Sequence, residues 1–190
     1  MSVIERLLRR DGDAWQAGDL TIAPMRRRDL RGGVMAIEAV SYPRPWSQSV
    51  FESELAQVRS GTRHYLVARR AAGSGRGSVA GYAGLWFAGD EAHVTNVAVA
   101  PSEQRRGVAT ALLLGLADEA IRRDRTAWTL EVRVSSTGAQ DLYRGFGFNP
   151  AGVRTRYYEN TEDAIVMWCN DIQGSEYAEL LDSMRARVNR

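Results

Sequence analysis

The chain has 190 residues, of which 44% are hydrophobic and 25% are charged, and its formal net charge is +2. This length fits one domain, since single domains usually contain about 100 to 200 residues, and the composition excludes a wholly disordered chain. So small a net charge does not indicate direct binding to nucleic acid. The single cysteine, Cys169, excludes an internal disulfide and is predicted to pack in a strand, while His64 and His93 lie too far apart in the sequence to indicate a metal site.

The apolar segments give no sign of a membrane span or of a secretory signal. The longest apolar run, Val108 to Ala117, has half of the roughly 20 residues that a membrane-spanning helix needs. Met1 to Arg10 places arginines after a short apolar patch, whereas a secretory signal has a basic stretch before a long apolar one. We therefore expect a cytoplasmic protein that does not bind membranes, either a monomer or a homodimer.

The first half of the chain alternates between strand and helix patterns. Residues 1–19 are predicted to be an N-terminal extension, in which apolar residues recur at helical spacing. The next predicted elements are a strand at 20–25, a helix at 29–41, an extended segment at 42–46, a helix from Ser47 or Ser49 to about 57, and strands at 64–69 and 79–87. The last two strands form a hairpin, and Gly73–Ser78 is predicted to be its flexible loop, because it lacks the Gly-Lys-Ser/Thr ending of a phosphate loop.

The second half repeats the order strand, helix, strand, helix. The predicted elements are a strand at 91–100, a helix at about 106–123, a strand at 126–132, a helix that ends at Gly147, strands at about 148–157 and 163–169, and an amphipathic helix near the end. These patterns indicate one α/β domain at residues 20–170, followed by a C-terminal helical extension at 171–190.

The junction between the strand that ends at Pro101 and the helix that follows predicts an anion site. Gly107 and Ala109 are small and let the backbone approach a ligand, while the N–H groups of the first helical turn lack internal partners and carry the positive end of the helix dipole. Arg105 and Arg106 could add charge to a pyrophosphate, or they could be solvated surface arginines.

Gln104-Arg105-Arg106-Gly107-Val108-Ala109, after a Val-Ala-Val strand, resembles the coenzyme A-binding signature of the GNAT acetyltransferase superfamily, with alanine in place of the second glycine. The likeness covers about residues 20–170. Leu130–Arg133 and Leu142–Phe148 resemble the later strand and helix of the superfamily. The segments that are most similar to RimI-type ribosomal-protein-alanine N-acetyltransferases are Pro45–Ser47, Leu130–Arg133, Arg156–Tyr158 and Glu162–Met167. The resemblance implies a GNAT fold: a mixed, mostly antiparallel sheet of six to seven strands with a central, splayed parallel pair, flanked by helices.

The resemblance also implies which residues contact the acetyl donor, acetyl-CoA. They are Val97, Ala98, Val99, Arg105, Arg106, Gly107, Val108, Ala109, Thr110 and Ser136. A backbone N–H of the Val97–Val99 strand is expected to hold the thioester carbonyl. Ser136 stands where RimI-type enzymes have an asparagine, and its hydroxyl could still donate a hydrogen bond.

Glu131 and Tyr143 are the candidates for acid–base chemistry. Glu131 lies between two apolar residues of a strand and therefore faces the opposite side of the sheet. The pattern alone also fits a solvent-facing carboxylate or one paired with an arginine such as Arg133, while the resemblance implies a general base that acts directly or through water. Tyr143 shares an apolar helix face, which by itself predicts a core tyrosine; the resemblance implies a general acid for the departing thiolate.

Three aromatic residues are candidates for the acceptor groove. Trp46, Tyr157 and Tyr158 resemble the loops that flank an extended peptide N-terminus in RimI-type enzymes, although aromatic residues can also be plain core. An α-amine has a pKa of about 7.7 to 8.0 and a lysine about 10.4, so an N-terminal acceptor needs less help from a base. The resemblance implies that the acceptor is the N-terminal alanine of a small-subunit ribosomal protein. A small-molecule amine acceptor and a non-catalytic acyl-CoA-binding module remain the alternatives.

Overall fold

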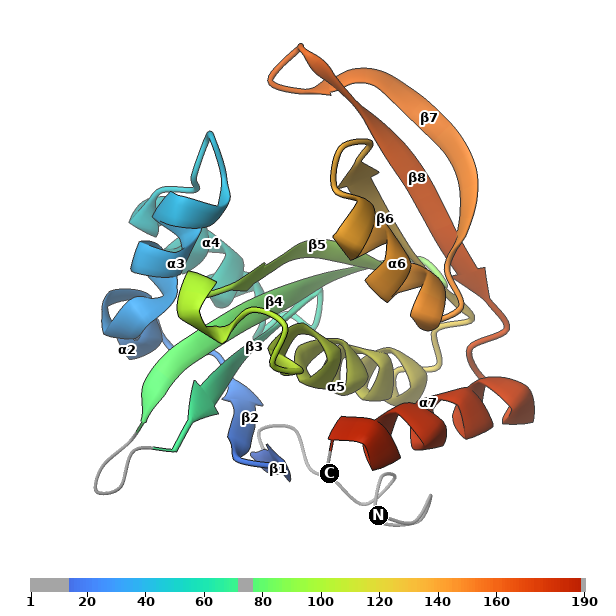
Figure 1. The fold of residues 1–190 in the computed structure, drawn as a ribbon, viewed down its shortest axis with the longest axis horizontal. Helices are drawn as coiled ribbons and strands as arrows, with labels where there is room; N and C mark the ends of the chain where they lie inside the picture. Colours follow the sequence, from blue (N-terminus) through green and yellow to red (C-terminus); the bar gives the residue numbers. More distant parts are fainter. Residues whose placement is uncertain (1–13, 72–76, 189–190) are drawn as a thin grey trace.

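A single twisted sheet runs through the protein and carries helices on both faces (Figure 1). The computed structural model describes residues 14–71 and 77–188. The strands within these residues are β1 (Trp15–Ala17), β2 (Leu20–Pro24), β3 (Arg63–Arg70), β4 (Ser78–Ala88), β5 (Glu91–Val99), β6 (Ala127–Arg133), β7 (Asn149–Tyr158) and β8 (Glu162–Asn170). They pair in the order β1-β2-β3-β4-β5-β6-β8-β7, and all neighbours are antiparallel except β5 and β6, which are parallel.

The described part of the sheet has eight strands, whereas the resemblance implied six to seven. Strand β1 lies in the segment that the sequence predicted to be an N-terminal extension, and it pairs with β2 in the register Trp15 to Ile22 and Ala17 to Leu20. Gly18 in the connecting turn has a φ of 59°, a left-handed conformation that favours glycine. Three residues are too few to display the period-two alternation by which a strand is recognised.

The helices form two layers that sandwich part of the sheet. They are α2 (Arg27–Asp29), the π-helix η1 (Leu30–Val34), α3 (Met35–Ser41), α4 (Gln48–Gln57), the 3-10 helix η2 (Pro101–Glu103), α5 (Val108–Arg122), α6 (Thr137–Gly145) and α7 (Ser175–Val188). Strand β3 shows both layers: Leu66 and Ala68 pack into the cluster with α5, α6 and α7, while Tyr65 and Val67 pack into the cluster with α3 and α4. Alternate side chains of a strand buried on both faces point into opposite layers.

Two predicted helices of the first layer differ in how well they match the structure. The helix predicted at 29–41 is interrupted, because Gly33 has a φ of 143° and its backbone approaches Val79, where an added Cβ would lie 2.8 Å from that side chain. The helix predicted after Ser47 is confirmed. Ser47 is its N-cap, and the Ser47 side chain accepts a hydrogen bond from the backbone N–H of Val50 at 3.4 Å.

Helix α5 is the centre of the second layer, and Ala111 to Ala117 are all buried. Gly115 allows close approach to β3, since a Cβ there would lie 2.7 Å from a methyl group of Leu66. Trp128 of β6 is fully buried, with its ring centroid 4.6 Å from that of Phe148 and 6.0 Å from that of Phe146. This packing holds β6 against the helical layer and so fixes the positions of the β6 residues that line the site.

The parallel strands β5 and β6 separate along their length, as the resemblance implied. They pair only at Glu91–His93 with Ala127–Thr129. Beyond that point β5 stays with β4 as far as Val99, and β6 stays with β8 as far as Arg133. Two neighbouring strands that part in this way leave unpaired backbone groups on both sides of a gap.

The remaining predictions for the second half are confirmed. The chain enters β7 through Gly147, whose φ is 84°, and Cys169 lies buried in β8. Helix α7 packs on α5, where Arg185 pairs with Asp118 at 2.5 Å. The helical spacing predicted within residues 1–10 and most of the hairpin loop at 73–78 lie outside the described residues. Of the helices that the structure describes, none is long and apolar enough to cross a membrane.

Candidate active site

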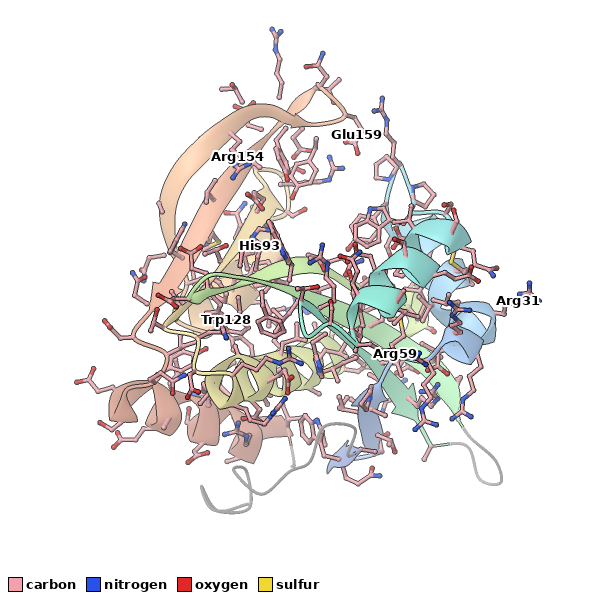
Figure 2. All side chains as sticks on the ribbon, turned by 180° about the vertical axis from the view of Figure 1, so that it is seen from behind. Arg31, Arg59, His93, Trp128, Arg154 and Glu159 are labelled. Carbon is pink, nitrogen blue, oxygen red and sulfur yellow. The ribbon has the colours of Figure 1, made fainter. Side chains whose placement is uncertain are left out.

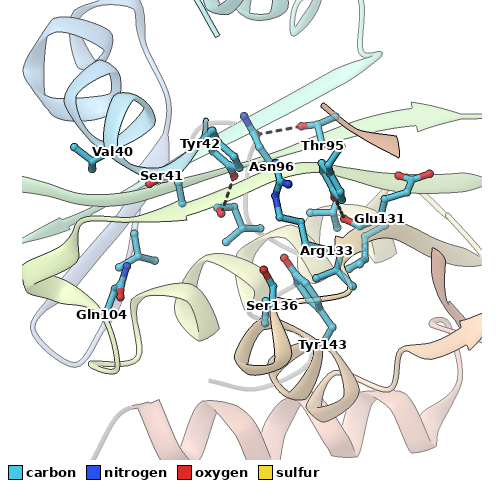
Figure 3. A pocket seen from close by; sticks show the side chains of 18 of the residues that line it. Val40, Ser41, Tyr42, Thr95, Asn96, Gln104, Glu131, Arg133, Ser136 and Tyr143 are labelled. Carbon is cyan, nitrogen blue, oxygen red and sulfur yellow. Dashed lines mark hydrogen bonds between the residues drawn. The ribbon is translucent and has the colours of Figure 1, made fainter. Parts of the chain in front are cut away.

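The gap between β5 and β6 opens into two joined hollows. The first, the acceptor cavity, has a volume of ≈390 Å³ and is lined by Tyr42, Asn96, Glu131, Arg133 and Tyr158, among others (Figure 3). The second, the donor groove, has a volume of ≈790 Å³ and runs along the start of α5 and the open side of α6. The residues that line both hollows are Val97, Val99, Gln104, Ser136, Ala139 and Tyr143.

The turn before α5 has a backbone conformation that suits the anion site predicted from the sequence. Arg105 and Gly107 have φ angles of 60° and 78°, so two left-handed residues curve the backbone around the helix start. The N–H of Ala111 bonds to the carbonyl of Gly107, and the preceding N–H groups of the first turn have no place in the helical ladder. An added Cβ on Gly107 would meet nothing within 4 Å. Open space and convergent N–H groups fit a pyrophosphate.

Most of the predicted donor contacts line the donor groove. They are Val97, Val99, Arg105, Gly107, Val108, Ala109, Thr110 and Ser136. Ala98 lines the acceptor cavity instead, and it is 4% exposed and packs with the α3–α4 layer, because side chains alternate along a strand. Arg106 turns toward a neighbouring hollow beside Arg187 and pairs with Glu103 at 3.3 Å.

Tyr143 belongs both to the core and to the site. Its ring is 9% exposed and lies edge-on to Phe148, with centroids 5.9 Å apart, as expected of a core tyrosine. It also lines both hollows, with its hydroxyl directed into the gap near Ser136 (Figure 3). Burial raises the pKa of Tyr143 to about 12, so the hydroxyl keeps its proton and can act as a donor at neutral pH.

Glu131 lies on the face of β6 opposite to the buried Leu130 and Val132, as predicted, and its side chain is 7% exposed. One carboxylate oxygen is 3.1 Å from Nε2 of His93, and the other is 3.1 Å from Nη2 of Arg154. The hydrogen bond from His93 lowers the pKa of Glu131 against the effect of burial, and the charges of His93 and Arg154 add to the lowering. In Figure 3 the carboxylate points away from Tyr143, so the two share a cavity without touching.

Arg133 does not pair with Glu131, the partner that the pattern suggested. It pairs with Glu159 at 2.7 Å and with Glu162 at 2.9 Å, both near the turn between β7 and β8. Its guanidinium also lies over the Tyr158 ring, 4.1 Å from the centroid. Hydrogen bonds from Ser135 and Arg133 lower the pKa of Glu162 to about 2. Arg133 therefore clamps the tip of the β7–β8 hairpin above the acceptor cavity.

The three aromatic residues predicted for the acceptor take three different places. Tyr158 lines the cavity, and its hydroxyl donates to the backbone carbonyl of Glu131 at 2.9 Å. Tyr157 is 48% exposed at the rim, edge-on to Tyr158 and beside Arg154. Trp46 lies outside the cavity lining: it packs edge-on to Phe51, with ring centroids 5.4 Å apart, and anchors its proline-containing turn.

Sequence reasoning missed Tyr42 and Asn96. The Tyr42 hydroxyl donates to the carbonyl of Val97 at 3.0 Å inside the gap, and burial raises the pKa of this tyrosine. Asn96 lines the acceptor cavity, and its Nδ2 has no hydrogen-bond partner among the described residues. The sequence contains a signal for Tyr42, because it precedes a proline and such a residue is disfavoured in a helix. In the structure Tyr42 ends α3 with an extended backbone, at a φ of −127° and a ψ of 137°.

The comparisons with known proteins agree with this geometry. The family model described as "Acetyltransferase (GNAT) family" matches residues 32–148. The [ribosomal protein bS18]-alanine N-acetyltransferase of Escherichia coli (strain K12) is 36% identical over 150 residues, which are 77% of this chain and 95% of that protein. A Bacillus subtilis (strain 168) protein named "Putative [ribosomal protein bS18]-alanine N-acetyltransferase" is 37% identical over 145 residues, which are 76% of this chain and 91% of that protein.

A solved structure extends this agreement to the fold. The crystal structure of the ribosomal-protein-S18-alanine N-acetyltransferase from Escherichia coli superimposes with a TM-score of 0.69 and 32% identity, over 83% of this chain and 97% of that one. Residues 32–148, which the family model matches, include β5, β6 and the turn before α5. The chain therefore belongs to the acetyltransferase (GNAT) family.

Proposed function

We propose that this chain is an acetyl-CoA-dependent N-acetyltransferase whose acceptor is the α-amine of a protein N-terminus, with the N-terminal alanine of a small-subunit ribosomal protein as the partner. The observation that carries the proposal is the pair of joined hollows, with an anion cradle at one end and Glu131 and Tyr158 at the other. The names of the E. coli and B. subtilis relatives support the choice of acceptor. Such an acceptor is made in the cytoplasm, so the proposal places the enzyme there.

The donor groove would hold acetyl-CoA by its backbone. The N–H groups at the start of α5, with Arg105 beside them, would bind the pyrophosphate. The unpaired edge of β5 at Val97–Val99 would bind the pantetheine arm and donate an N–H to the thioester carbonyl. Acetyl-CoA supplies the acetyl group as an activated thioester, and the chain's own groups orient it at the gap.

Glu131 suits an α-amine better than a lysine. A carboxylate with a lowered pKa is a weak base, and a lysine side chain has a pKa of about 10.4, so proton removal from lysine would be strongly uphill. An α-amine has a pKa of about 7.7 to 8.0 and is partly neutral at physiological pH. Glu131 would therefore attract the ammonium form to the cavity and accept its first proton, directly or through water, which leaves the neutral amine that attacks the thioester. The nitrogen loses a second proton as the amide forms, and the departing thiolate takes up one proton to leave as the thiol of CoA.

Tyr143 would donate a hydrogen bond to the departing sulfur. A thiol has a pKa of about 8.5 and the Tyr143 hydroxyl one of about 12, so the phenol gives up its proton to a thiolate reluctantly. A hydrogen bond to the developing negative charge lowers the barrier without complete transfer. Tyr143 is thus proposed to stabilise the leaving group, which sharpens the general-acid role that the resemblance implies.

The proposal is tested with a panel of peptides that differ only in the first residue, together with spermidine as a small amine. We expect acetylation at the α-amine, fastest for alanine, and a fall in kcat of about a hundredfold or more in Glu131→Gln. Glu179→Gln, which removes an exposed carboxylate on α7, is the charge-matched control and should leave the rate unchanged. Activity on spermidine without activity on any peptide would overturn the acceptor assignment.

The position of the acetyl group is read by mass spectrometry of the peptides. Each peptide also carries one internal lysine, and a copy with a formylated α-amine reports acetylation of that lysine alone. The enzyme contains no lysine, since its 25 Lys and Arg residues are all arginines. Any acetyl-lysine in the mixture therefore comes from the peptide. Equal modification of free and formylated peptides would mean that the site acetylates lysine.

A further inference from the structure

His93 connects the proposed base to the last paired residues of the parallel strands. Its Nε2 lies 3.1 Å from a carboxylate oxygen of Glu131, and its Nδ1 lies 2.8 Å from Oγ1 of Thr129. The register pairs His93 directly with Thr129, and β5 and β6 part immediately beyond this pair. Glu131 is two residues after Thr129 on the same face of β6, so the imidazole spans both side chains.

The local structure holds the ring in this place. The imidazole lies edge-on to Trp86 of β4, with centroids 6.2 Å apart, and Thr129 is 6% exposed beneath it. Figure 2 shows His93 over the middle of the sheet, on the side from which Arg154 of β7 also approaches. The side chain of His93 is 25% exposed, so protons exchange between the ring and solvent.

The charged groups around His93 come from four strands. Glu131 of β6 contacts it directly, and Arg154 of β7 holds the other oxygen of the same carboxylate. Arg63 of β3 lies over the far side of Trp86, 5.3 Å from the ring centroid. Glu91 precedes His93 by two residues on β5 and therefore shares its face of the strand.

We propose that His93 is a positioning residue whose protonation switches Glu131 between an available and a blocked state. This rests on the proposed function of Glu131. Neutral His93 donates Nε2–H to Glu131 and accepts a hydrogen bond from the Thr129 hydroxyl at Nδ1, so it fixes the carboxylate and leaves its negative charge free to attract the acceptor ammonium. Protonated His93 and Arg154 together place two cations on one carboxylate, which then neither attracts the ammonium nor accepts its proton.

The steady-state test compares wild type with His93→Gln and His93→Ala on an alanine-first peptide, from pH 5.5 to 8. Glutamine keeps an N–H donor for Glu131 and carries no charge at any pH. At pH 8 we expect His93→Gln to retain near-wild-type kcat/KM and His93→Ala to lose about tenfold. Toward pH 5.5 the ratio of His93→Gln to wild type should rise about tenfold, because protonation removes the neutral imidazole of wild type and glutamine carries no charge.

The amine of the peptide also ionises in this range, but it does so equally for each variant and cancels in the ratio. A flat ratio from pH 8 to 5.5 would overturn the proposal, and so would a His93→Gln enzyme as slow as His93→Ala at pH 8. Circular dichroism at each pH shows whether the variants are folded. If Glu131→Gln proves fully active, the proposed base fails first, and that result is distinct from a flat ratio.

A second readout is independent of activity. The sequence has two histidines, so the imidazole C–H signals of the full chain can be assigned by NMR with a His64→Gln variant. The midpoint of the His93 titration should coincide with the midpoint of the kinetic ratio. A His93 midpoint that differs from the midpoint of the kinetic ratio would overturn the proposal.

Discussion

The donor groove and the acceptor cavity meet at Tyr143, yet they are built by different means. In the donor groove the groups proposed to bind the donor belong to the backbone: the turn before α5, with left-handed Arg105 and Gly107, and the unpaired edge of β5. The acceptor cavity is made of side chains, with Glu131, Arg133 and Tyr158 from β6 and β7. Backbone N–H groups are the same in every residue type, so a donor groove of this kind tolerates side-chain change wherever the conformation survives.

The acceptor cavity, in contrast, depends on ion pairs between side chains. Glu131 is held by His93 and Arg154, and Arg133 is held by Glu159 and Glu162. Each of these contacts joins residues that are far apart in the sequence. Selectivity for an acceptor can therefore change through single side chains while the use of acetyl-CoA stays constant, which is a way for one fold to serve many amines.

Among the changes that test this comparison, the largest expected effect is at Tyr143, where the two hollows meet. Tyr143→Phe removes the hydroxyl and keeps the ring that packs on Phe148, so we expect kcat to fall about a hundredfold with the protein still folded. Binding of acetyl-CoA, measured by calorimetry, should change little. Tyr177→Phe deletes a hydroxyl from a buried tyrosine of α7 and is the matched control. An active Tyr143→Phe enzyme would break the claim that the hydroxyl serves the leaving group.

The next effect tests the backbone character of the donor groove. Gly107→Ala meets no neighbour, so its cost is the left-handed φ of 78°, about 1 to 2 kcal/mol in the free energy of unfolding. If the turn relaxes, the N–H groups lose their convergence, and KM for acetyl-CoA should rise about tenfold while KM for the peptide stays constant. Gly145→Ala, also without a close neighbour but at the end of α6, should not reduce stability or binding. If Gly107→Ala and Gly145→Ala had the same KM for acetyl-CoA, binding of the donor would not depend on the backbone conformation at Gly107.

The same difference explains what the sequence could predict. The anion cradle is local: strand, turn and helix start lie within about fifteen residues, and short-range physics suffices to predict it. The separation of β5 and β6 came from family resemblance, because no residue pattern marks where two strands part. The opposite orientation of Glu131 followed from period-two alternation alone, since Leu130 and Val132 are apolar.

The partners of Glu131 could not be predicted in the same way. The pattern fitted either a solvent-facing carboxylate or one paired with an arginine such as Arg133, which is near Glu131 in the sequence. Two residues that share one face of a strand need not pair with each other. In the structure Arg133 pairs with Glu162 near the β7–β8 turn, and Glu131 pairs with His93 and Arg154. These choices depend on the register of four strands, and on how far the hairpin bends over the sheet. The place of Trp46 could not be predicted for a related reason: its ring packs on Phe51 of α4, a contact set by tertiary packing.

The smallest expected effect concerns the clamp between Arg133 and the β7–β8 turn. The pKa of Glu162 is about 2 in the folded protein, below the value of about 4.3 for an unperturbed glutamate. A lowered folded pKa means that the stabilising contribution is fully present above about pH 4.5 and is lost as the pH falls toward about 2. Glu162→Gln should therefore have a slightly lower Tm than wild type at pH 6, and the difference should vanish near pH 2.

Because Glu162 is near the surface, the clamp should matter more for the peptide than for stability. We expect KM for the alanine-first peptide to rise about twofold to fivefold in Glu162→Gln, with KM for acetyl-CoA unchanged. Thermal unfolding followed by circular dichroism from pH 2 to 6 measures the first effect, with Glu179→Gln as the reference for loss of an exposed charge. If Glu162→Gln raised KM for acetyl-CoA instead, the hairpin would be shaping the donor groove, and the division between a backbone-built donor side and a side-chain-built acceptor side would fail.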